Sequence, residues 1–499
     1  MNRDDDMISA AIGRRALLAA AAAAAAAASM LAAPAGAQAP APAPPPPDIR
    51  DRTTILIRGA TVISMDPAIG DLVRGDILIE NGAIRAIGAN VAAPADALII
   101  DATGKIACPG FVNGHVHLPQ ALQRGLSADH SFGDYFRSIV LRYSNRMTPA
   151  EVALGVRIGG LHEMAVGTTT LVDWNREVIS PEHADAAVEG HFASGARTVL
   201  CYTVPLRPRD GSTPNHARML EHAKALRAGK LASDTGRVRL GVCLPGPDFM
   251  PLDPALADLA MLRELDVLTA FHCGAPIYAA RKKRVVATLA ERGLLDRNTQ
   301  LVHANDLDLD EYRIAADNGA SLTSTPEAEM HMGHGFPAIG RARDAGLRFS
   351  LGTDIPSAFG GGMLSQMRVA YAADLALRNA TSFRDTGKPP QVKPWSARAM
   401  LEILTIGAAR SVNMDQVIGS LAPGKRADIL LFNGGSTGLA PVLDPVGSIV
   451  LQATPADIDT VIVDGRVMKS GGRMTDPELP RIVDEVKVRA AAMVEAATR

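Results

Sequence analysis

Four apolar runs of this chain end on side chains that can bind a metal ion. The first, residues 109–117 (PGFVNGHVH), reads as a buried strand that ends on His115 and His117. Residues two apart on a strand point to the same side, so both imidazoles can reach one ion. The pattern recurs in three later runs, which end on His272, His303 and Asp354.

Each of these residues also has a purely structural alternative. A histidine at a strand end can hydrogen-bond the backbone, and an aspartate after a glycine turn can act as a cap. The recurrence of one pattern along the chain favours a shared site over separate structural roles.

Strand-like runs alternate with longer amphipathic stretches between about residues 109 and 400, for example at 149–166 and 254–265. This alternation predicts an α/β fold with a parallel sheet, and we expect a TIM-like (β/α)8 barrel at 109–410. In such a barrel, functional side chains collect at the carboxyl ends of the strands. One site can therefore gather residues that lie far apart in the sequence.

Both ends of the mature chain are rich in short β runs and turn signals, such as Glu80-Asn81-Gly82-Ala83. Residues 53–108 predict one part of a small β domain, and 411–475 predict the other. We expect a domain built from both termini, followed by a C-terminal helix at 476–499.

The first residues have the layout of an export signal. Arg14-Arg15 precede an alanine-rich apolar run, and Ala35-Gly36-Ala37 offers a cleavage site, which indicates a twin-arginine-type signal peptide at 1–37. A Pro/Ala-rich linker follows at 38–52. We expect a periplasmic or secreted protein with no stable membrane insertion after cleavage; an uncleaved membrane anchor is the alternative.

Composition indicates an ordinary globular protein. The 51 basic residues are offset by 53 acidic ones, which argues against a nucleic-acid partner. The four cysteines are too few and too widely spread for a disulfide framework, so we expect buried free thiols. We also expect a homo-oligomer that acts on a small-molecule substrate.

Taken together, these motifs resemble the amidohydrolase superfamily, in the branch of cytosine deaminase, S-adenosylhomocysteine deaminase and the triazine hydrolases. The resemblance spans nearly all of the mature chain. It includes the β segment, the signature at 109–117, the later histidines and aspartate, and Gly419 to Asp428 leading into the closing strands.

The resemblance implies one divalent metal, zinc or iron(II), held by four residues: His115, His117, His272 and Asp354. His303 would lie beside the activated water and the substrate. Asp354 would take the proton of the water, and His303 would stabilise the developing oxyanion. A two-metal relative would need a lysine at the end of the fourth strand. The run that most resembles an early barrel strand, 167–174, has none.

One departure from the family pattern concerns proton transfer. Many deaminases of this branch carry a glutamate three residues after the third histidine, whereas residues 272–275 read His-Cys-Gly-Ala. Three carboxylates are possible replacements, although each is also compatible with a surface position: Asp306, Glu327 and Glu329.

Two histidines beyond the presumed seventh strand, His331 and His334, are candidates for the pocket wall, with a solvated loop position as the alternative. We expect His303, His334 and Glu327 to contact the substrate.

The predicted function is that of a metal-dependent hydrolase. Activated water would attack an sp² carbon and break a C–N bond of an amide or aminated heterocycle. From a different class, the missing glutamate permits a catalytically weak protein that keeps the fold and binds metal and ligand.

Overall fold

The computed structural model of this protein describes residues 49–203, 216–246, 249, 251–274, 284–391 and 393–498. The predicted signal peptide at 1–37 and the linker up to residue 48 lie outside the described residues. Ala275, at the position where the resemblance leads us to expect a glutamate, lies outside them too.

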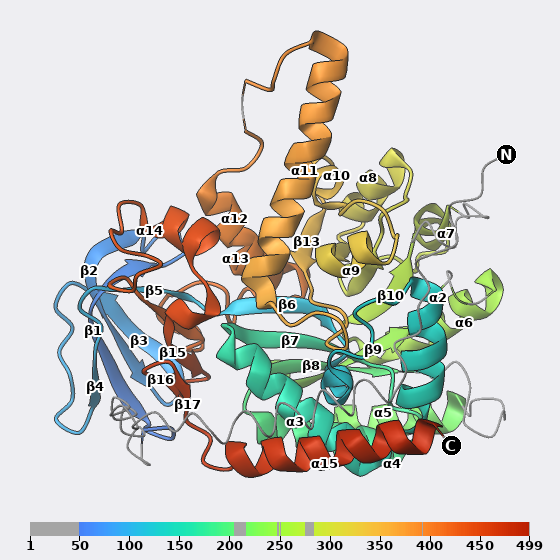
Figure 1. The fold of residues 1–499 in the computed structure, drawn as a ribbon, viewed down its shortest axis with the longest axis horizontal. Coiled ribbons are helices and arrows are strands. Elements are labelled where there is room, and N and C mark those ends of the chain that lie inside the picture. The colour runs from blue at the N-terminus through green and yellow to red at the C-terminus, as the bar shows by residue number, and fades with distance from the viewer. Residues whose placement is uncertain are drawn as a thin grey trace, which may run out of the picture. The chain divides into compact units, whose positions relative to one another are not determined.

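Eight parallel strands, paired in chain order, form the central barrel (Figure 1). They are β6 (Phe111–Val116), β7 (Thr168–Asn175), β8 (Arg197–Thr203), β9 (Val238–Leu244), β10 (Thr269–Cys273), β11 (Thr299–His303), β12 (Ser321–Ser324) and β13 (Arg348–Leu351). A single parallel bridge, between Val116 and Asp354, joins the last strand to the first. The predicted (β/α)8 barrel is confirmed.

Helices follow the strands, as expected for parallel pairing. They are α3 (Pro149–Ala165), α4 (Pro181–Ser194), α5 (His216–Ala228), α6 (Leu252–Leu262), α7 (Val285–Glu291), α8 (Leu309–Asp317), α9 (Pro326–His331), α10 (Ile339–Asp344), α11 (Gly362–Thr386), α12 (Ala397–Leu404) and α13 (Ile406–Ser411). Local sequence determines where α3 starts. Thr148 and Glu151 form a capping box, and Pro149 takes the first turn, where no amide donor is needed.

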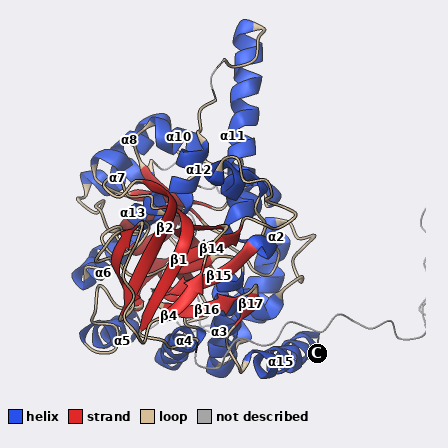
Figure 2. Cartoon of the chain, turned by 90° about the vertical axis from the view of Figure 1, so that its left-hand side faces the viewer, coloured by secondary structure: helices blue, strands red, loops and turns tan. Residues whose placement is uncertain are grey.

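A nine-stranded sheet contains strands from both ends of the chain (Figure 2). Its N-terminal members are β1 (Thr54–Ile63), β2 (Asp71–Glu80), β3 (Ala83–Gly88), β4 (Leu98–Asp101) and β5 (Lys105–Pro109), and its C-terminal members are β14 (Ile429–Asn433), β15 (Ile458–Val463), β16 (Arg466–Ser470) and β17 (Arg473–Met474). β14 pairs with β5 on one side and with β15 on the other. The expected β domain from both termini is therefore confirmed.

The turn between β2 and β3 shows how local sequence builds this sheet. Asn81 and Gly82 both have positive φ, at 50° and 80°. Such a pair suits the two-residue hairpin turn whose twist matches the flanking strands.

An ion-pair network joins the sheet to the barrel. The guanidinium of Arg197, at the start of β8, donates to both oxygens of Asp428 at 2.8 and 3.0 Å and to Asp464 at 2.7 Å. Arg197 is fully buried. A buried charge is stable only when it is paired in this way, so the network fixes the sheet against the amino end of β8.

Polar side chains cross the barrel interior. Gln300 of β11 donates to the carbonyl of Gly114 in β6 at 3.2 Å and to the Thr323 hydroxyl at 2.7 Å. Gly114 leaves room for this network, because a Cβ there would lie 2.2 Å from Ser350 Oγ.

All four cysteines are buried and free, as expected. Within the described part of the chain, no helix is both long and apolar enough to span a membrane. The chain ends in helix α15 (Leu479–Thr498).

Candidate metal centre and adjoining cavity

The barrel closes at the candidate site itself. The Asp354 amide donates to the carbonyl of His115 at 3.0 Å, and the His117 amide donates to the carbonyl of Asp354 at 2.8 Å. This close approach needs Gly352, where a Cβ would lie 2.5 Å from the carbonyl oxygen of His115. Asp354 itself has a left-handed φ of 61°, a conformation that non-glycine residues adopt at a cost and that recurs at functional sites.

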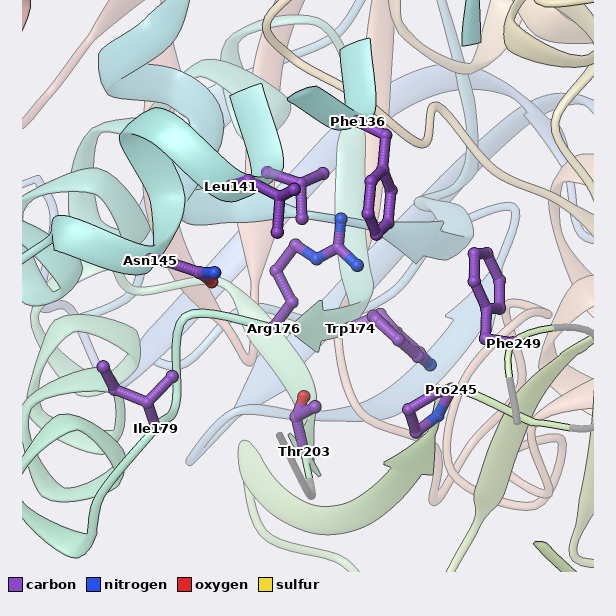
Figure 3. Close-up of a pocket in the computed structure, with 10 residues that line it drawn as sticks. Phe136, Leu141, Asn145, Trp174, Arg176, Ile179, Thr203, Pro245 and Phe249 are labelled. Carbon is purple, nitrogen blue, oxygen red and sulfur yellow. The ribbon is translucent and has the colours of Figure 1, made fainter. Parts of the chain in front are cut away.

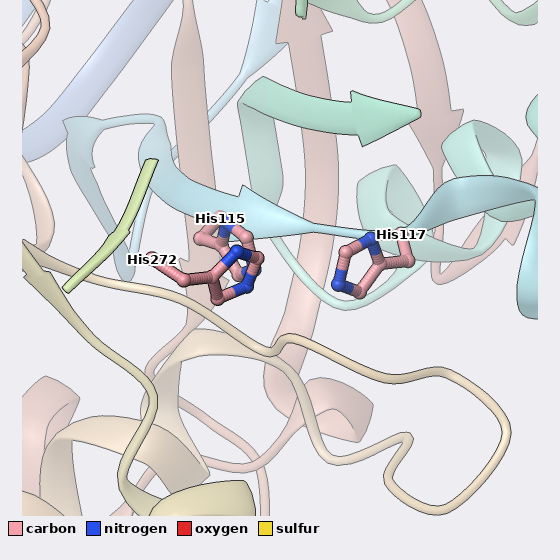
Figure 4. Close-up of side chains that lie close together, drawn as sticks. All are labelled: His115, His117 and His272. Atoms are coloured by element: carbon pink, nitrogen blue, oxygen red, sulfur yellow. The ribbon is translucent and has the colours of Figure 1, made fainter. Parts of the chain in front are cut away.

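Three imidazoles converge beside this closure. The candidate ligand atoms of His115, His117 and His272 all lie within 4.8 Å of one another (Figure 4). The carboxylate of Asp354 completes the group, with Oδ1 at 3.3 Å from Nε2 of both His115 and His117. All four residues are buried. The predicted metal ligands thus come together although they belong to three separate stretches of the chain.

The donor atoms fit a divalent metal. Neither ring nitrogen of His115 nor Nδ1 of His272 has a hydrogen-bond partner among the described residues. His117 Nδ1 lies 2.6 Å from the carbonyl of Trp174 and must donate to it, which leaves the Nε2 lone pair facing Asp354. Two ligands at about 2.0–2.1 Å on a tetrahedral zinc lie about 3.3 Å apart. Asp354 Oδ1 lies at this separation from Nε2 of both His115 and His117.

Burial sets the charge of these groups. It lowers the pKa of His115 to about 4 and that of His272 well below its usual value, so both imidazoles are neutral near pH 7. Burial alone would raise the pKa of Asp354, but the imidazoles of His115 and His117 next to its carboxylate hold it well below the usual range. Neutral imidazoles and an ionised carboxylate are the protonation states that a metal requires.

His303 lies at the end of β11, also with a left-handed φ, of 70°. Its Nδ1 is 3.1 Å from the Thr325 hydroxyl and 3.3 Å from Glu329 Oε1. Thr325 in turn donates to Asp354 Oδ2 at 3.3 Å. These contacts place the Nδ1 proton of His303 toward Glu329 and Thr325, and His303 also lines a small cavity over the candidate ligands.

The three candidate replacements for the missing glutamate lie in different places. Glu329 is fully buried against His303 and also accepts hydrogen bonds from Ser324 and from the Thr325 amide, both at 2.7 Å. Glu327 accepts hydrogen bonds from Ser365 and Gln366 of α11. Among the described residues, none of the three carboxylates lines either of the two cavities at the site. The structure therefore does not bring Glu327 into the group around His303.

A small cavity of about 30 Å³ lies over the ligands, and His117, His272, His303, His334 and Asp354 line it. His334 is buried, with its ring centroid 4.9 Å from that of His303. Burial lowers the pKa of His334 to about 3. His331, by contrast, is exposed and packs against Phe359.

A second cavity, of about 290 Å³, adjoins the first (Figure 3). The two share the side chains of Phe136, Arg176 and Phe249. Sequence reasoning missed Arg176 and its neighbour Trp174, although both lie at the carboxyl end of β7. The position of a polar or aromatic residue at that strand end is the signal that would have found them.

The fourth barrel strand is β9, and the run 167–174 belongs to the second strand, β7. The sequence of β9, VRLGVCL, contains no lysine either. The strand at which a two-metal relative would need its lysine therefore has none in this chain.

The sequence matches the Amidohydrolase family over residues 106–468. It is 29% identical over 452 residues to a 5-methylthioadenosine/S-adenosylhomocysteine deaminase of Desulforudis audaxviator, covering 88% of this chain and 99% of the relative. A 5'-deoxyadenosine deaminase of Methanothermobacter thermautotrophicus is 26% identical over 454 residues, covering 89% of this chain and 99% of the relative.

Solved structures show the same fold. An atrazine chlorohydrolase, TrzN, from Arthrobacter aurescens TC1 complexed with zinc matches with a TM-score of 0.76 and 23% identity, over 87% of this chain and 100% of that one. A zinc-bound adenosine deaminase from Xanthomonas campestris matches with a TM-score of 0.75 and 20% identity, over 88% of this chain and 98% of that one.

Proposed function

Because the chain belongs to the amidohydrolase family, we propose that it is a metal-dependent hydrolase that uses water to break a C–N bond at an sp² carbon. The observation that carries this proposal is the convergence of three buried imidazoles on the Asp354 carboxylate, with no other partner for His115 among the described residues. Such an arrangement has little structural purpose without an ion, because it leaves buried polar atoms unsatisfied.

His115, His117, His272 and Asp354 would hold one divalent ion. Zinc suits three imidazoles and a carboxylate, and iron(II) is the alternative. When bound, such an ion lowers the pKa of a water ligand toward neutrality and makes hydroxide available for attack. The zinc in the two similar structures supports the first choice.

The protein's own residues would handle the protons. Asp354 keeps one oxygen toward the histidines and the other toward Thr325, and it would accept the proton of the attacking water. His303 would direct Nε2 at the oxygen or nitrogen on which charge develops. Glu329 would act as a positioning residue, because its carboxylate holds the opposite side of the His303 ring.

The substrate class is proposed as an aminated heterocycle. Two relatives that this chain covers nearly end to end bear the names of nucleoside deaminases, and this supports a ring carbon with an exocyclic amine over an open amide. A panel should begin with 5'-deoxyadenosine, 5-methylthioadenosine and S-adenosylhomocysteine and extend to aminated triazines and simple amides.

Hydrolysis of this panel, combined with metal analysis, tests the proposal. We expect about one equivalent of zinc or iron per chain and release of ammonia or an amine from at least one compound. Two tightly held metals would contradict the mononuclear site. One metal without turnover of any compound would favour the alternative of a catalytically weak binding protein.

We further propose that the protein is exported and acts on its small-molecule substrate as a homo-oligomer, without nucleic acid. The Arg14-Arg15 pair and the cleavage site Ala35-Gly36-Ala37 support export. Light scattering of the mature protein after size-exclusion chromatography would test the oligomer, and a monomer at micromolar concentration would refute it.

A further inference from the structure

We infer that Arg176 binds a carboxylate group of the substrate, so that the substrate class is an anionic one. This inference rests on the proposed hydrolase function and narrows it. Arg176 follows β7 directly, and its side chain lines both the small cavity at the metal ligands and the larger cavity beside it. A group held by this guanidinium would therefore lie next to the reacting carbon.

The guanidinium of Arg176 projects into apolar surroundings. Phe136 and Phe249 form the shared wall, and the guanidinium carbon lies 5.8 Å from the ring centroid of Trp174 (Figure 3). A cation over an indole is favourable, but it leaves the five N–H donors of arginine without acceptors. Among the described residues, no side chain or carbonyl accepts a hydrogen bond from this guanidinium, and no acid pairs with it.

The neighbouring acids do not supply the missing charge. Glu177 is next in sequence, but it is fully buried, and neither of its oxygens has a hydrogen-bond partner among the described residues. Burial raises the pKa of Glu177, while the nearby charge of Arg176 opposes the rise, and no ion pair or hydrogen bond joins the two side chains. Asp354, the acid of the small cavity, is engaged by His115 and His117.

The larger cavity adds one further unsatisfied donor to the guanidinium of Arg176. The indole N–H of Trp174 is buried and has no acceptor among the described residues. The hydroxyl of Thr203 already donates to the Asn175 carbonyl at 2.6 Å. A ligand that satisfies the free donors must bring acceptor oxygens, and a carboxylate matches the forked N–H groups of arginine in two parallel hydrogen bonds.

The size and lining of the cavity define the rest of the ligand. About 290 Å³ accommodates a ring or a short branched chain, and Leu141, Ile179 and Pro245 add apolar wall. The inferred substrate therefore combines a hydrolysable C–N bond, an apolar or aromatic body and a carboxylate.

The test compares two small probes of the same shape, phenylacetate and the neutral phenylacetamide, by calorimetric titration of the zinc-loaded mature protein. We expect the wild type to prefer phenylacetate. Arg176→Gln should weaken phenylacetate binding about 10- to 100-fold, the range for a charge-assisted hydrogen bond, and change phenylacetamide binding less than about threefold. Arg176→Lys should restore part of the preference.

Arg146→Gln is the matched control, because it removes a nearby exposed arginine whose neighbour Asn145 lines the cavity. It should leave the affinity for both probes unchanged. If phenylacetate binds the metal instead, Arg176→Gln will bind it as tightly as the wild type does, and the inference is overturned. Equal weakening by Arg146→Gln and Arg176→Gln would also overturn it, since any positive charge would then suffice.

A failure of the proposed hydrolase function can be distinguished from a failure of this inference about Arg176. The titrations need no turnover, so a protein that hydrolyses nothing can still show the Arg176-dependent preference. Conversely, an active enzyme whose Arg176→Gln variant keeps the full preference for phenylacetate would refute the inference and leave the hydrolase function standing.

Discussion

His115 and Asp354 contact each other twice, once through the backbone and once through their side chains. The Asp354 amide donates to the carbonyl of His115 at 3.0 Å, and His115 Nε2 lies 3.3 Å from Asp354 Oδ1. The hydrogen bond that brings the last strand to the first thus also brings two candidate ligands together. A substitution of His115 or Asp354 can therefore affect both metal binding and the closure of the barrel, so metal content and folding should both be measured.

Asp354→Asn should abolish turnover, because it weakens a metal ligand and removes the proton acceptor. We expect kcat to fall at least about 10²- to 10⁴-fold and the copurifying metal to drop below one equivalent per chain. Steady-state rates and elemental analysis measure both effects. Asp310→Asn, at an exposed ion pair with Arg284, is the control and should behave as the wild type. Near-wild-type activity of Asp354→Asn would refute the mechanism.

Glu329→Gln should lower kcat about 10- to 100-fold with little change in KM, because the amide no longer holds the His303 ring as a carboxylate does. Glu327→Gln is the natural comparison, since Glu327 contacts α11 instead. It should change kcat less than about threefold, as expected for a residue away from the reacting atoms. If Glu327→Gln is the more damaging change, the assignment of the two residues is reversed.

Arg197→Met should destabilise the protein by about 3–5 kcal/mol, because it leaves the buried carboxylate of Asp428 without its positively charged partner. Urea unfolding of the purified variants gives the measurement. Arg466→Met removes an exposed ion pair with Asp51 and should cost less than about 1 kcal/mol. Similar losses for the two variants would show that the buried network contributes no more than a surface pair.

Stability should fall on acidification through the burial of His334. The pKa of His334 is lowered to about 3 in the folded protein, while the unfolded chain titrates near 6.5. The unfolded state therefore binds the extra proton between these values, and stability is lost as the pH falls from about 6.5 toward 3. At pH 5 the cost is about 1–2 kcal/mol.

His334→Gln removes this titration, so the variant should lose less stability than the wild type between pH 7.5 and pH 5 in urea unfolding. An identical loss in both proteins would show that the folded state accommodates the protonated imidazole of His334.

Export should remove the N-terminal segment. Mass spectrometry of the exported protein from its native host should find a start near Gln38, after the small residues Ala35-Gly36-Ala37. Replacement of both arginines, Arg14→Lys with Arg15→Lys, should retain the precursor inside the cell. An intact Met1 in the exported fraction would contradict cleavage.

Most of the fold could be predicted because its signals are local. Alternation of apolar runs with amphipathic stretches indicated the barrel, and Asn81-Gly82 marked a hairpin of the terminal sheet. The family resemblance and the enzyme class that it implied, a hydrolase of C–N bonds, are confirmed as well. The convergence of His115, His117 and His272 was anticipated from the strand ends alone.

The finer parts of the site depend on orientation, which the sequence does not display. Glu327 and Glu329 are two residues apart on α9, so the helical period turns their side chains to opposite sides. Only the structure shows which of them faces His303. Arg176 went unnoticed because a single arginine after a strand resembles any surface charge until the cavity around it is known.

The order in which the chain is synthesised gives β14 a particular importance. β14 lies between β5 and β15 in the sheet, but it is synthesised only after all eight barrel strands. Until then β5 has an unpaired edge. Because β6 follows β5 after one residue, the first barrel strand is anchored to an unfinished sheet during all this time. Completion of the fold therefore waits for the last part of the chain, and a polypeptide cut short before β14 should aggregate through that edge rather than accumulate as a free barrel.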